Sequence, residues 1–188
     1  MKNSSKWLIG IAIVVVIIAV WLVGAYNNFI KLDQEAQAQW AQVESQYQRR
    51  FDLIPNLVAS VQGILKQEQA IFGMIAEART RYAGAQGVEN KVQAANQLES
   101  ALSRLLVVME NYPTLKSNEN VQTLMVQLEG TENRIAVERG RYNELVKIFN
   151  VSVTKFPSNV LARIFGFSAK GFFESTVGAE IAPQVKLN

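Results

Sequence analysis

An uninterrupted apolar run opens the chain and predicts a membrane anchor. From Leu8 to Ala25 about eighteen residues carry no charge, close to the roughly twenty that cross a bilayer as a helix. Trp7 and Tyr26 bracket the run, and a helix would place them about 29 Å apart, which matches the two interfacial aromatic belts of a bilayer. We therefore expect a single-pass transmembrane helix with Trp7, Trp21 and Tyr26 as its anchor residues.

A cleaved signal peptide is the alternative to this anchor, because Val23, Gly24 and Ala25 satisfy the small-residue rule for a cleavage site. The apolar part of a signal peptide usually has only about 7 to 15 residues, which favours an uncleaved anchor here. Lys2 and Lys6 precede the run, and basic residues mark the cytoplasmic side. We predict a cytoplasmic N-terminus and an extracytoplasmic body.

After the anchor, apolar residues recur every three or four positions, the period of amphipathic helices. Four such stripes are present: Ala36, Trp40, Val43, Tyr47 and Ile54; then Leu57, Val58, Val61, Leu65, Phe72 and Ile75; then Val92, Ala95, Leu98, Leu102, Leu105 and Met109; and finally Val121, Leu124, Leu128, Thr131, Ile135, Glu138, Tyr142, Leu145 and Phe149. The last stripe has the heptad spacing of a coiled coil, and no alternating run predicts a strand. The sequence predicts an all-α, antiparallel up-and-down four-helix bundle.

Proline residues mark the expected helix boundaries. Pro55, Pro113 and Pro157 stand where the helical pattern falters. Neither Gly nor Pro interrupts residues 25–54, so we expect the anchor to continue through this range as a rod of about 70 Å. A second helix is expected to begin beside Pro55 with Asp52 as its N-cap. The alternative is one helix kinked at Pro55.

Aromatic residues are concentrated after the fourth stripe. Ser158 is expected to cap a short apolar helix that Gly166 ends. The up-and-down path returns this segment to the bilayer surface. Two roles are open for its phenylalanines: they close the end of the bundle core, or they lie in the lipid interface. These residues are Phe156, Phe165, Phe167, Phe172 and Phe173.

The body is long enough for one globular domain. We expect an anchor over 1–26, long helices over 27–152, a short apolar helix and Phe-rich segment over 153–173, and an extended or mobile tail over 174–188. The formal charge of +3 falls to +1 once the two lysines before the anchor are set aside, so nucleic acid is not an expected partner.

The chain has no cysteine and no histidine. Disulfides and thiolate sites are therefore excluded, and the commonest metal ligand and general base near neutral pH are missing. This composition rules out zinc enzymes that use these ligands, Ser-His-Asp and Cys-His hydrolases, and histidine kinases. We predict no catalytic, cofactor-binding or metal-binding residues.

Two polar residues, Thr131 and Glu138, fall on the apolar stripe of the last helix. A buried carboxylate needs a partner, and Arg49 or Arg50 is the expected partner of Glu138. Such a pair would fix helix register; the alternatives are a surface for a partner protein and an acid or carboxylate metal site. No loop has the dense Asp/Asn spacing of a Mg²⁺ or Ca²⁺ site. A carboxylate-dependent envelope hydrolase using Glu132 or Glu138 is thus the lowest of the functional alternatives.

Several short motifs follow the anchor in a fixed order. They are Tyr26–Asn27, Gln48–Val58 (QRRFDLIPNLV), Tyr112–Lys116, Thr131–Ala136, Arg141–Asn143, Phe156–Asn159 and Phe165–Phe167. Together they resemble the signature stretches of the bacterial LemA family, from the anchor to about Phe173. The resemblance assigns structural or interaction roles to Arg50, Asp52, Pro55, Asn56, Thr131, Glu132, Asn133, Arg134, Glu138, Tyr142 and Asn143.

The resemblance implies a single-pass protein of the bacterial inner membrane, with no agreed reaction, no cofactor and no catalytic residues. It also implies the lipid bilayer, and a membrane protein such as a membrane metalloprotease, as partners. The long rod and the heptads add an expected homo-oligomer. We therefore expect a membrane-anchored helical scaffold or adaptor of the bacterial envelope, with a membrane-interface-binding or membrane-shaping protein as the alternative.

Overall fold

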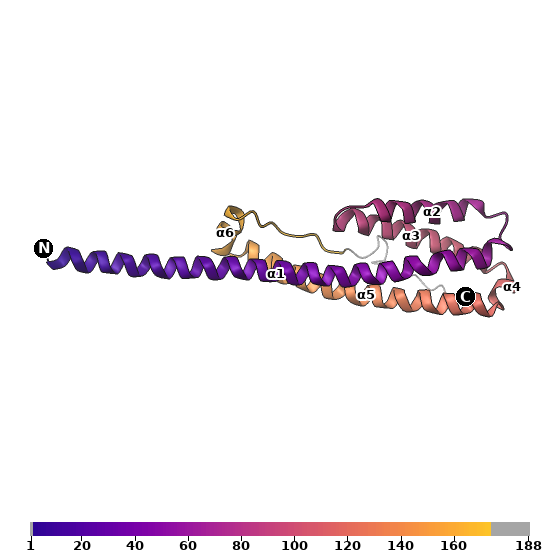
Figure 1. Ribbon diagram of the computed structural model, residues 1–188, viewed down its shortest axis with the longest axis horizontal. Coiled ribbons are helices and arrows are strands. Elements are labelled where there is room, and N and C mark those ends of the chain that lie inside the picture. The colour runs from indigo at the N-terminus through magenta and orange to yellow at the C-terminus, as the bar shows by residue number, and fades with distance from the viewer. Residues whose placement is uncertain (1, 174–188) are drawn as a thin grey trace, which may run out of the picture.

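The chain is helical almost throughout the part that the structure describes. The computed structural model describes residues 2–173, and Figure 1 labels the helices in chain order. Their bounds are α1 Lys2–Gln62, α2 Gln69–Gly84, α3 Val88–Met109, α4 Pro113–Lys116, α5 Glu119–Thr154 and α6 Ser158–Ile164. These residues include no strand, which confirms the predicted all-α class. The expected tail over 174–188 lies outside the described residues.

Helix α1 joins the apolar run to the body without a break. It has 61 residues, and no residue of its most apolar stretch is buried by the rest of the protein. Among the described residues, α1 is the one helix that is long and apolar enough to cross a bilayer. The predicted continuity from the anchor to Ile54 is confirmed, because the rod in Figure 1 extends from the bare N-terminal end into the body.

The expected helix boundary at Pro55 is wrong. Helix α1 passes through Pro55 and ends at Gln62, as in the single-helix alternative. A proline inside a helix removes one N–H donor and crowds the preceding turn. Ile54 and Leu57 on either side are completely buried, and we infer that their packing offsets this cost.

Asp52 is therefore not an N-cap. It lies inside α1, where its carboxylate accepts a hydrogen bond from Gln48 Nε2 at 2.9 Å. The true break begins at Gly63, and the Val61 carbonyl accepts from the Leu65 N–H at 2.9 Å in the turn that follows. The break at Gly63 lies within the second predicted stripe: Leu57, Val58 and Val61 belong to α1, and Phe72 and Ile75 belong to α2.

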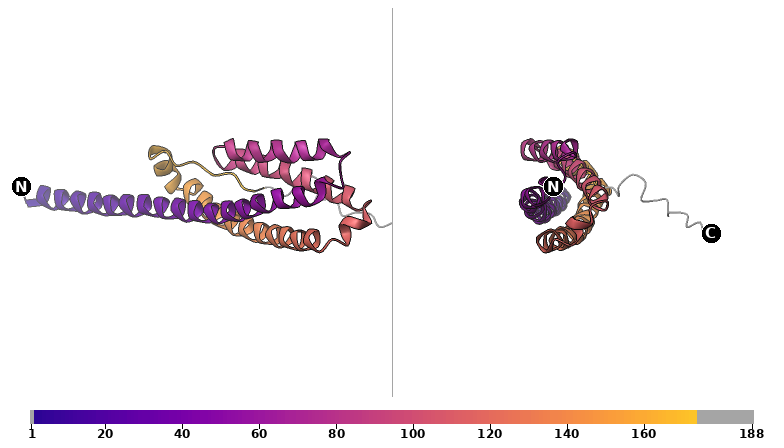
Figure 2. Two further views of the ribbon diagram at one scale, coloured as in Figure 1. Left: turned by 45° about the vertical axis from the view of Figure 1, so that its right-hand side comes forward. Right: turned by 90° about the vertical axis from the view of Figure 1, so that its right-hand side faces the viewer.

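The four long helices form two close pairs. α1 lies along α5, and α2 lies along α3; Gly87, with φ of 78°, joins α2 to α3. The end-on view in Figure 2 shows α1 between α5 and the α2–α3 hairpin. Successive long helices run in alternating directions (Figure 1). Because α1 touches both neighbours, it contributes to most of the core.

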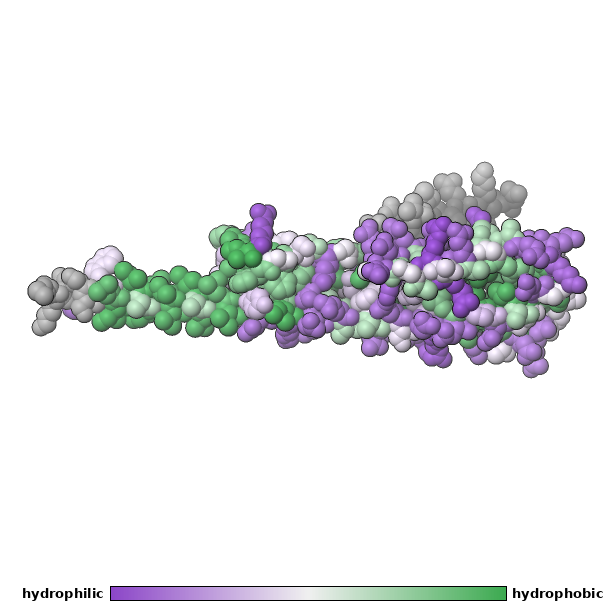
Figure 3. Space-filling view, turned by 45° about the horizontal axis from the view of Figure 1, so that its top comes forward, coloured by the Kyte–Doolittle hydropathy of each residue, from purple (hydrophilic) through white to green (hydrophobic). Residues whose placement is uncertain are grey.

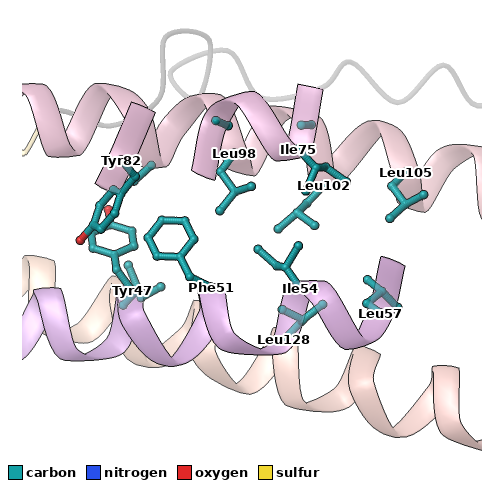
Figure 4. Packing of buried hydrophobic residues seen from close by; sticks show 14 of the residues in the cluster. Tyr47, Phe51, Ile54, Leu57, Ile75, Tyr82, Leu98, Leu102, Leu105 and Leu128 are labelled. Atoms are coloured by element: carbon teal, nitrogen blue, oxygen red, sulfur yellow. The ribbon is translucent and has the colours of Figure 1, made fainter. Parts of the chain in front are cut away.

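Large side chains fill the space between α1 and the α2–α3 hairpin (Figure 4). Phe51 of α1 meets Tyr82 of α2 with ring centroids 4.2 Å apart. Leu98 and Leu102 of α3 extend the same cluster. A second, smaller cluster lies toward the apolar end of α1 and is formed by Phe29, Phe149, Val153, Leu161 and Ala162.

Helix α5 contains the fourth predicted stripe and extends beyond it at both ends. Asn118 caps it, its side-chain oxygen accepting from the Val121 N–H at 3.2 Å. Most of the predicted stripe is buried, namely Val121, Leu128, Thr131, Ile135, Tyr142 and Phe149. Leu124, Glu138 and Leu145 are half-buried, and Val146, next to Leu145, is fully buried.

The short helix α6 confirms one predicted boundary and corrects the other. Ser158 is its first residue and makes no capping bond, since Pro157 occupies the N-cap position. Gly166, with φ of 77°, ends the helix, and the Phe167 N–H reaches back to the Ala162 carbonyl at 2.8 Å. This bond and the left-handed glycine are typical of a Schellman motif.

Candidate functional site

Helix α6 packs against α1 where the apolar run ends (Figure 1). The ring of Tyr26 lies 4.8 Å from Phe165 and 6.2 Å from Phe167 between centroids. Phe29, one turn further along α1, lies 5.3 Å from Phe167. Leu22, inside the apolar run, packs against the same cluster. The body thus contacts the candidate span at its boundary with the polar part of α1.

One face of α6 is buried and another exposes large apolar side chains. Leu161 and Ala162 pack into the second cluster, whereas Phe156 is 77% exposed and Ile164 is 70% exposed. We name the exposed set the α6 patch: Phe156, Val160, Ile164 and Phe165. In the space-filling view the apolar surface of the anchor is followed by apolar surface at α6 (Figure 3).

Two of the five C-terminal phenylalanines take the first expected role, closure of the core. Phe173 is buried in the main core, and Phe167 packs against the second cluster. Phe156, Phe165 and Phe172 are exposed. Core closure thus accounts for two of the five side chains and leaves three free of the core.

An extended segment follows α6 and lies along α5; we name residues 167–173 the strap. Asn150 donates to the Lys170 carbonyl at 2.8 Å and accepts from the Lys170 N–H at 2.7 Å. Asn143 makes the same pair of bonds with Phe173, at 2.9 and 2.8 Å. Each side-chain amide therefore pairs with the strap backbone as a neighbouring β-strand would.

Side chains of the strap also contact both long helices. Lys170 Nζ lies 2.6 Å from the Asp33 carboxylate of α1. The Phe173 ring lies 5.7 Å from Trp40 and 5.3 Å from Tyr142 between centroids. The strap thereby covers the α1–α5 pair where the α2–α3 hairpin does not reach (Figure 1).

The expected partner of Glu138 is wrong. Its carboxylate accepts from Gln39 Nε2 of α1 at 2.5 Å and from Arg141 Nη1 at 2.8 Å. Arg50 is paired with Glu132 instead, and Arg49 is exposed. The stripe correctly predicted that Glu138 faces α1. Because α1 and α5 are antiparallel, however, the α1 residue at the height of Glu138 is Gln39 and not Arg49 or Arg50.

The other family-motif residues fall into buried and exposed groups. Thr131 is 2% exposed, and its hydroxyl donates to the Leu128 carbonyl at 2.7 Å, which removes the need for a partner on another helix. Asn56, Asn133 and Arg134 are exposed. These three side chains lie outside the core.

Arg139 joins four parts of the body, and the sequence pattern did not single it out. Its Nε donates to the Tyr47 hydroxyl at 2.9 Å, and its guanidinium carbon lies 5.3 Å from the centre of the Phe173 ring. Asn96 and Glu99 of α3 lie within 3.4 and 4.0 Å of its Nη2. The position of Arg139 next to the apolar stripe is the sequence feature that could have indicated this role, because a partly buried arginine needs polar partners.

Burial raises the pKa of three tyrosines. Desolvation is the largest cause at Tyr47, where the charge and hydrogen bond of Arg139 oppose it. At Tyr82 the nearby Glu44 raises the pKa further, and at Tyr142 the charge of Asp33 does so. All three side chains therefore favour the neutral phenol in the folded protein.

We predict that the body loses stability above about pH 10. The unfolded chain releases tyrosine protons at the ordinary pKa of 10.0, whereas the folded chain retains them above this pH. The free energy of unfolding is therefore unaffected by these tyrosines below pH 10 and falls as the pH rises above 10. Each tyrosine that stays neutral lowers the free energy of unfolding by about 1.4 kcal/mol per pH unit. Urea unfolding at pH 8 to 11 measures this slope.

Tyr82→Phe provides the matched comparison for this pH series. The two proteins differ only at residue 82, so the difference between the two slopes reports on Tyr82. The variant is expected to lose stability less steeply between pH 10 and 11. Equal slopes in the two proteins would show that Tyr82 ionises as easily when folded as when unfolded.

The described residues offer no group of three or more acidic side chains that could hold a metal ion. A groove of about 270 Å³ runs between α2 and α3, lined in part by Met74, Ala78, Arg81 and Arg104. Arg81 donates hydrogen bonds to Glu77 and Gln97, and Arg104 Nη1 lies 3.5 Å from Met74 Sδ.

The comparisons with known proteins identify the family. The chain is 30% identical to magnetosome proteins MamQ 1 and MamQ 2 of Paramagnetospirillum magneticum (strain ATCC 700264 / AMB-1), over 85% of this chain and 70% of each relative. It is 29% identical to magnetosome protein MamQ of Magnetospirillum gryphiswaldense over the same shares. The model of the LemA family matches residues 39–187, which include the body and not the apolar run. The chain belongs to the LemA family.

Proposed function

We propose that the protein is a single-pass, membrane-anchored scaffold or adaptor of the bacterial envelope, without a reaction of its own. The observation that carries this proposal is the continuity of α1, which supplies both the apolar run and the central helix of the body. A continuous helix that crosses a bilayer and then forms part of the body fixes the orientation of that body relative to the membrane. Such an arrangement suits the positioning of other proteins.

The orientation within the inner membrane is part of the same proposal. Lys2 and Lys6 precede the apolar run, and by the positive-inside rule they favour a cytoplasmic N-terminus. The α1–α5 pair and the α2–α3 hairpin would then form a four-helix bundle in the extracytoplasmic space. Its partners are a second copy of the chain or another membrane protein, such as a membrane metalloprotease.

Measuring native size tests the proposal. The full-length protein is purified in mild detergent, its mass is measured, and copurified proteins are identified. A homo-oligomer supports a scaffold, and a stoichiometric complex with one membrane protein supports an adaptor. A monomer without a partner, both in detergent and after crosslinking in the membrane, contradicts both forms of the proposal.

A carboxylate-dependent hydrolase is separated from the scaffold by Glu138→Gln. The carboxylate contacts Gln39 and Arg141, and glutamine preserves its shape. If the protein is a scaffold or adaptor, we expect this variant to retain the native size of the complex and its partner. Loss of a cell-wall or lipid hydrolysis by a variant that still folds would overturn the proposed absence of catalysis.

A further inference from the structure

We propose that the α6 patch is a second membrane contact, which lies in the interface of a bilayer containing anionic phospholipid. This inference rests on the proposed function, because it takes α1 to cross the bilayer next to α6. It adds that the body touches the membrane through residues more than a hundred positions after the anchor.

The position of α6 along α1 is the first observation that supports this contact. Phe165 packs on Tyr26, and the second cluster includes contacts from Leu22 and Ala25 of the apolar run. Residues at this level of a spanning helix lie at the boundary between hydrocarbon and headgroups. The α6 patch is therefore held at the depth where aromatic and aliphatic side chains are stabilised by a bilayer.

The second observation is the shape of the apolar surface. Val160 and Ile164 lie one turn apart within α6 and are both exposed, so they share one side of the helix. Phe156 is exposed in the turn just before α6. The opposite side is fixed to the body through Leu161 and Ala162. This arrangement is typical of a helix that lies in the plane of the interface.

Charge favours anionic lipid over a neutral surface. Residues 145–173 contain four basic side chains and no acidic one. Lys147 is near Glu144 and Lys170 is paired with Asp33. Lys155 precedes Phe156 and Arg163 precedes Ile164, and neither has an acidic partner among the described residues. Basic residues next to an interfacial helix attract anionic headgroups.

The experiment uses single cysteines, because the chain has none of its own. Val160→Cys and Ile164→Cys report on the α6 patch, Val15→Cys reports on the anchor, and Val126→Cys is an exposed control on α5. Each full-length variant carries a fluorescent label and is placed in nanodiscs of phosphatidylcholine, with or without phosphatidylglycerol. Quenching by a lipid-bound nitroxide is compared with quenching by iodide in water.

We expect the labels at 15, 160 and 164 to be quenched from the lipid and the label at 126 from water. Phosphatidylglycerol is expected to raise lipid quenching at 160 and 164 by about twofold or more, because each basic residue near an anionic surface gains favourable energy. The double variant Lys155→Gln/Arg163→Gln is expected to lose this increase. The label at 15 is expected to be unaffected by lipid charge.

Different failures separate the inference from the proposed function. If iodide quenches the labels at 160 and 164 while the lipid-bound nitroxide quenches the label at 15, the inference about the α6 patch is wrong and the proposed anchor stands. Protection from both quenchers would show that protein covers the patch, which also overturns it. Equal quenching at 160 and 164 with and without phosphatidylglycerol would overturn the preference for anionic lipid. Quenching from water at 15 would overturn the anchor itself.

Discussion

Replacing Phe51 by alanine is expected to lower the free energy of unfolding of the body by about 3 to 5 kcal/mol. Phe51 is buried between Tyr47 and Tyr82, with ring centroids 6.3 and 4.2 Å away. It spans the space between α1 and the α2–α3 hairpin (Figure 4). Alanine would leave a cavity there, because α1 is also packed against α5 and cannot move freely to fill it.

Phe172→Ala is the matched control for this prediction. It removes the same ring from a side chain that is half exposed in the strap, so we expect a change below about 1 kcal/mol. Both variants are compared with the parent chain by urea unfolding in detergent, followed by circular dichroism. If the two variants lost a similar amount of unfolding free energy, the prediction that Phe51 holds α1 to the α2–α3 hairpin would be wrong.

Replacing Asn27 by proline is expected to uncouple the apolar run of α1 from the body. Asn27 is exposed and lies between the apolar run and the second cluster. Proline inside a helix removes an N–H donor and clashes with the carbonyl four residues earlier, which costs about 3 kcal/mol or more. At Pro55 the residue immediately before the proline, Ile54, is completely buried, whereas Tyr26, which would precede the proline at position 27, is exposed.

Electron–electron distances between two spin labels measure this uncoupling. Cysteines replace Val15 in the apolar run and Val137 on the exposed side of α5. The parent chain is expected to give one narrow distance distribution, and Asn27→Pro a broader or shifted one. Asn27→Ala retains the helix and serves as the control. A narrow, unshifted distribution for the proline variant would contradict a rigid connection through α1.

The periodic part of the fold is predictable from the sequence because each stripe depends on residues close together in the chain. Ala95, Leu98 and Leu102 are buried as their spacing predicts. Pro55 shows the limit of such local reasoning. A proline usually ends a helix, but tertiary packing of Ile54 and Leu57 overrides this preference, and no local pattern contains that information.

The candidate site depends on contacts between distant residues, and these were the hardest to predict. Glu138 was placed on the correct face, but its partner is Gln39, ninety-nine positions earlier. Choosing among partners requires the relative level of two helices along their axes, which periodicity does not give. The exposed phenylalanines raised a related difficulty, since an aromatic stripe suits a core and a lipid interface equally well.

The paired amides of the strap have a consequence for how this segment can vary. Asn143 and Asn150 are two helical turns apart, about 10.5 Å, and three residues of extended chain, from Lys170 to Phe173, cover about 10 Å. The amides bind backbone atoms, so the residue types at positions 171 and 172 do not set this match. These two positions are therefore tolerant of substitution, but the segment is sensitive to length. Deleting one residue between the two contacts would draw Phe173 away from its aromatic neighbours while leaving every helix intact.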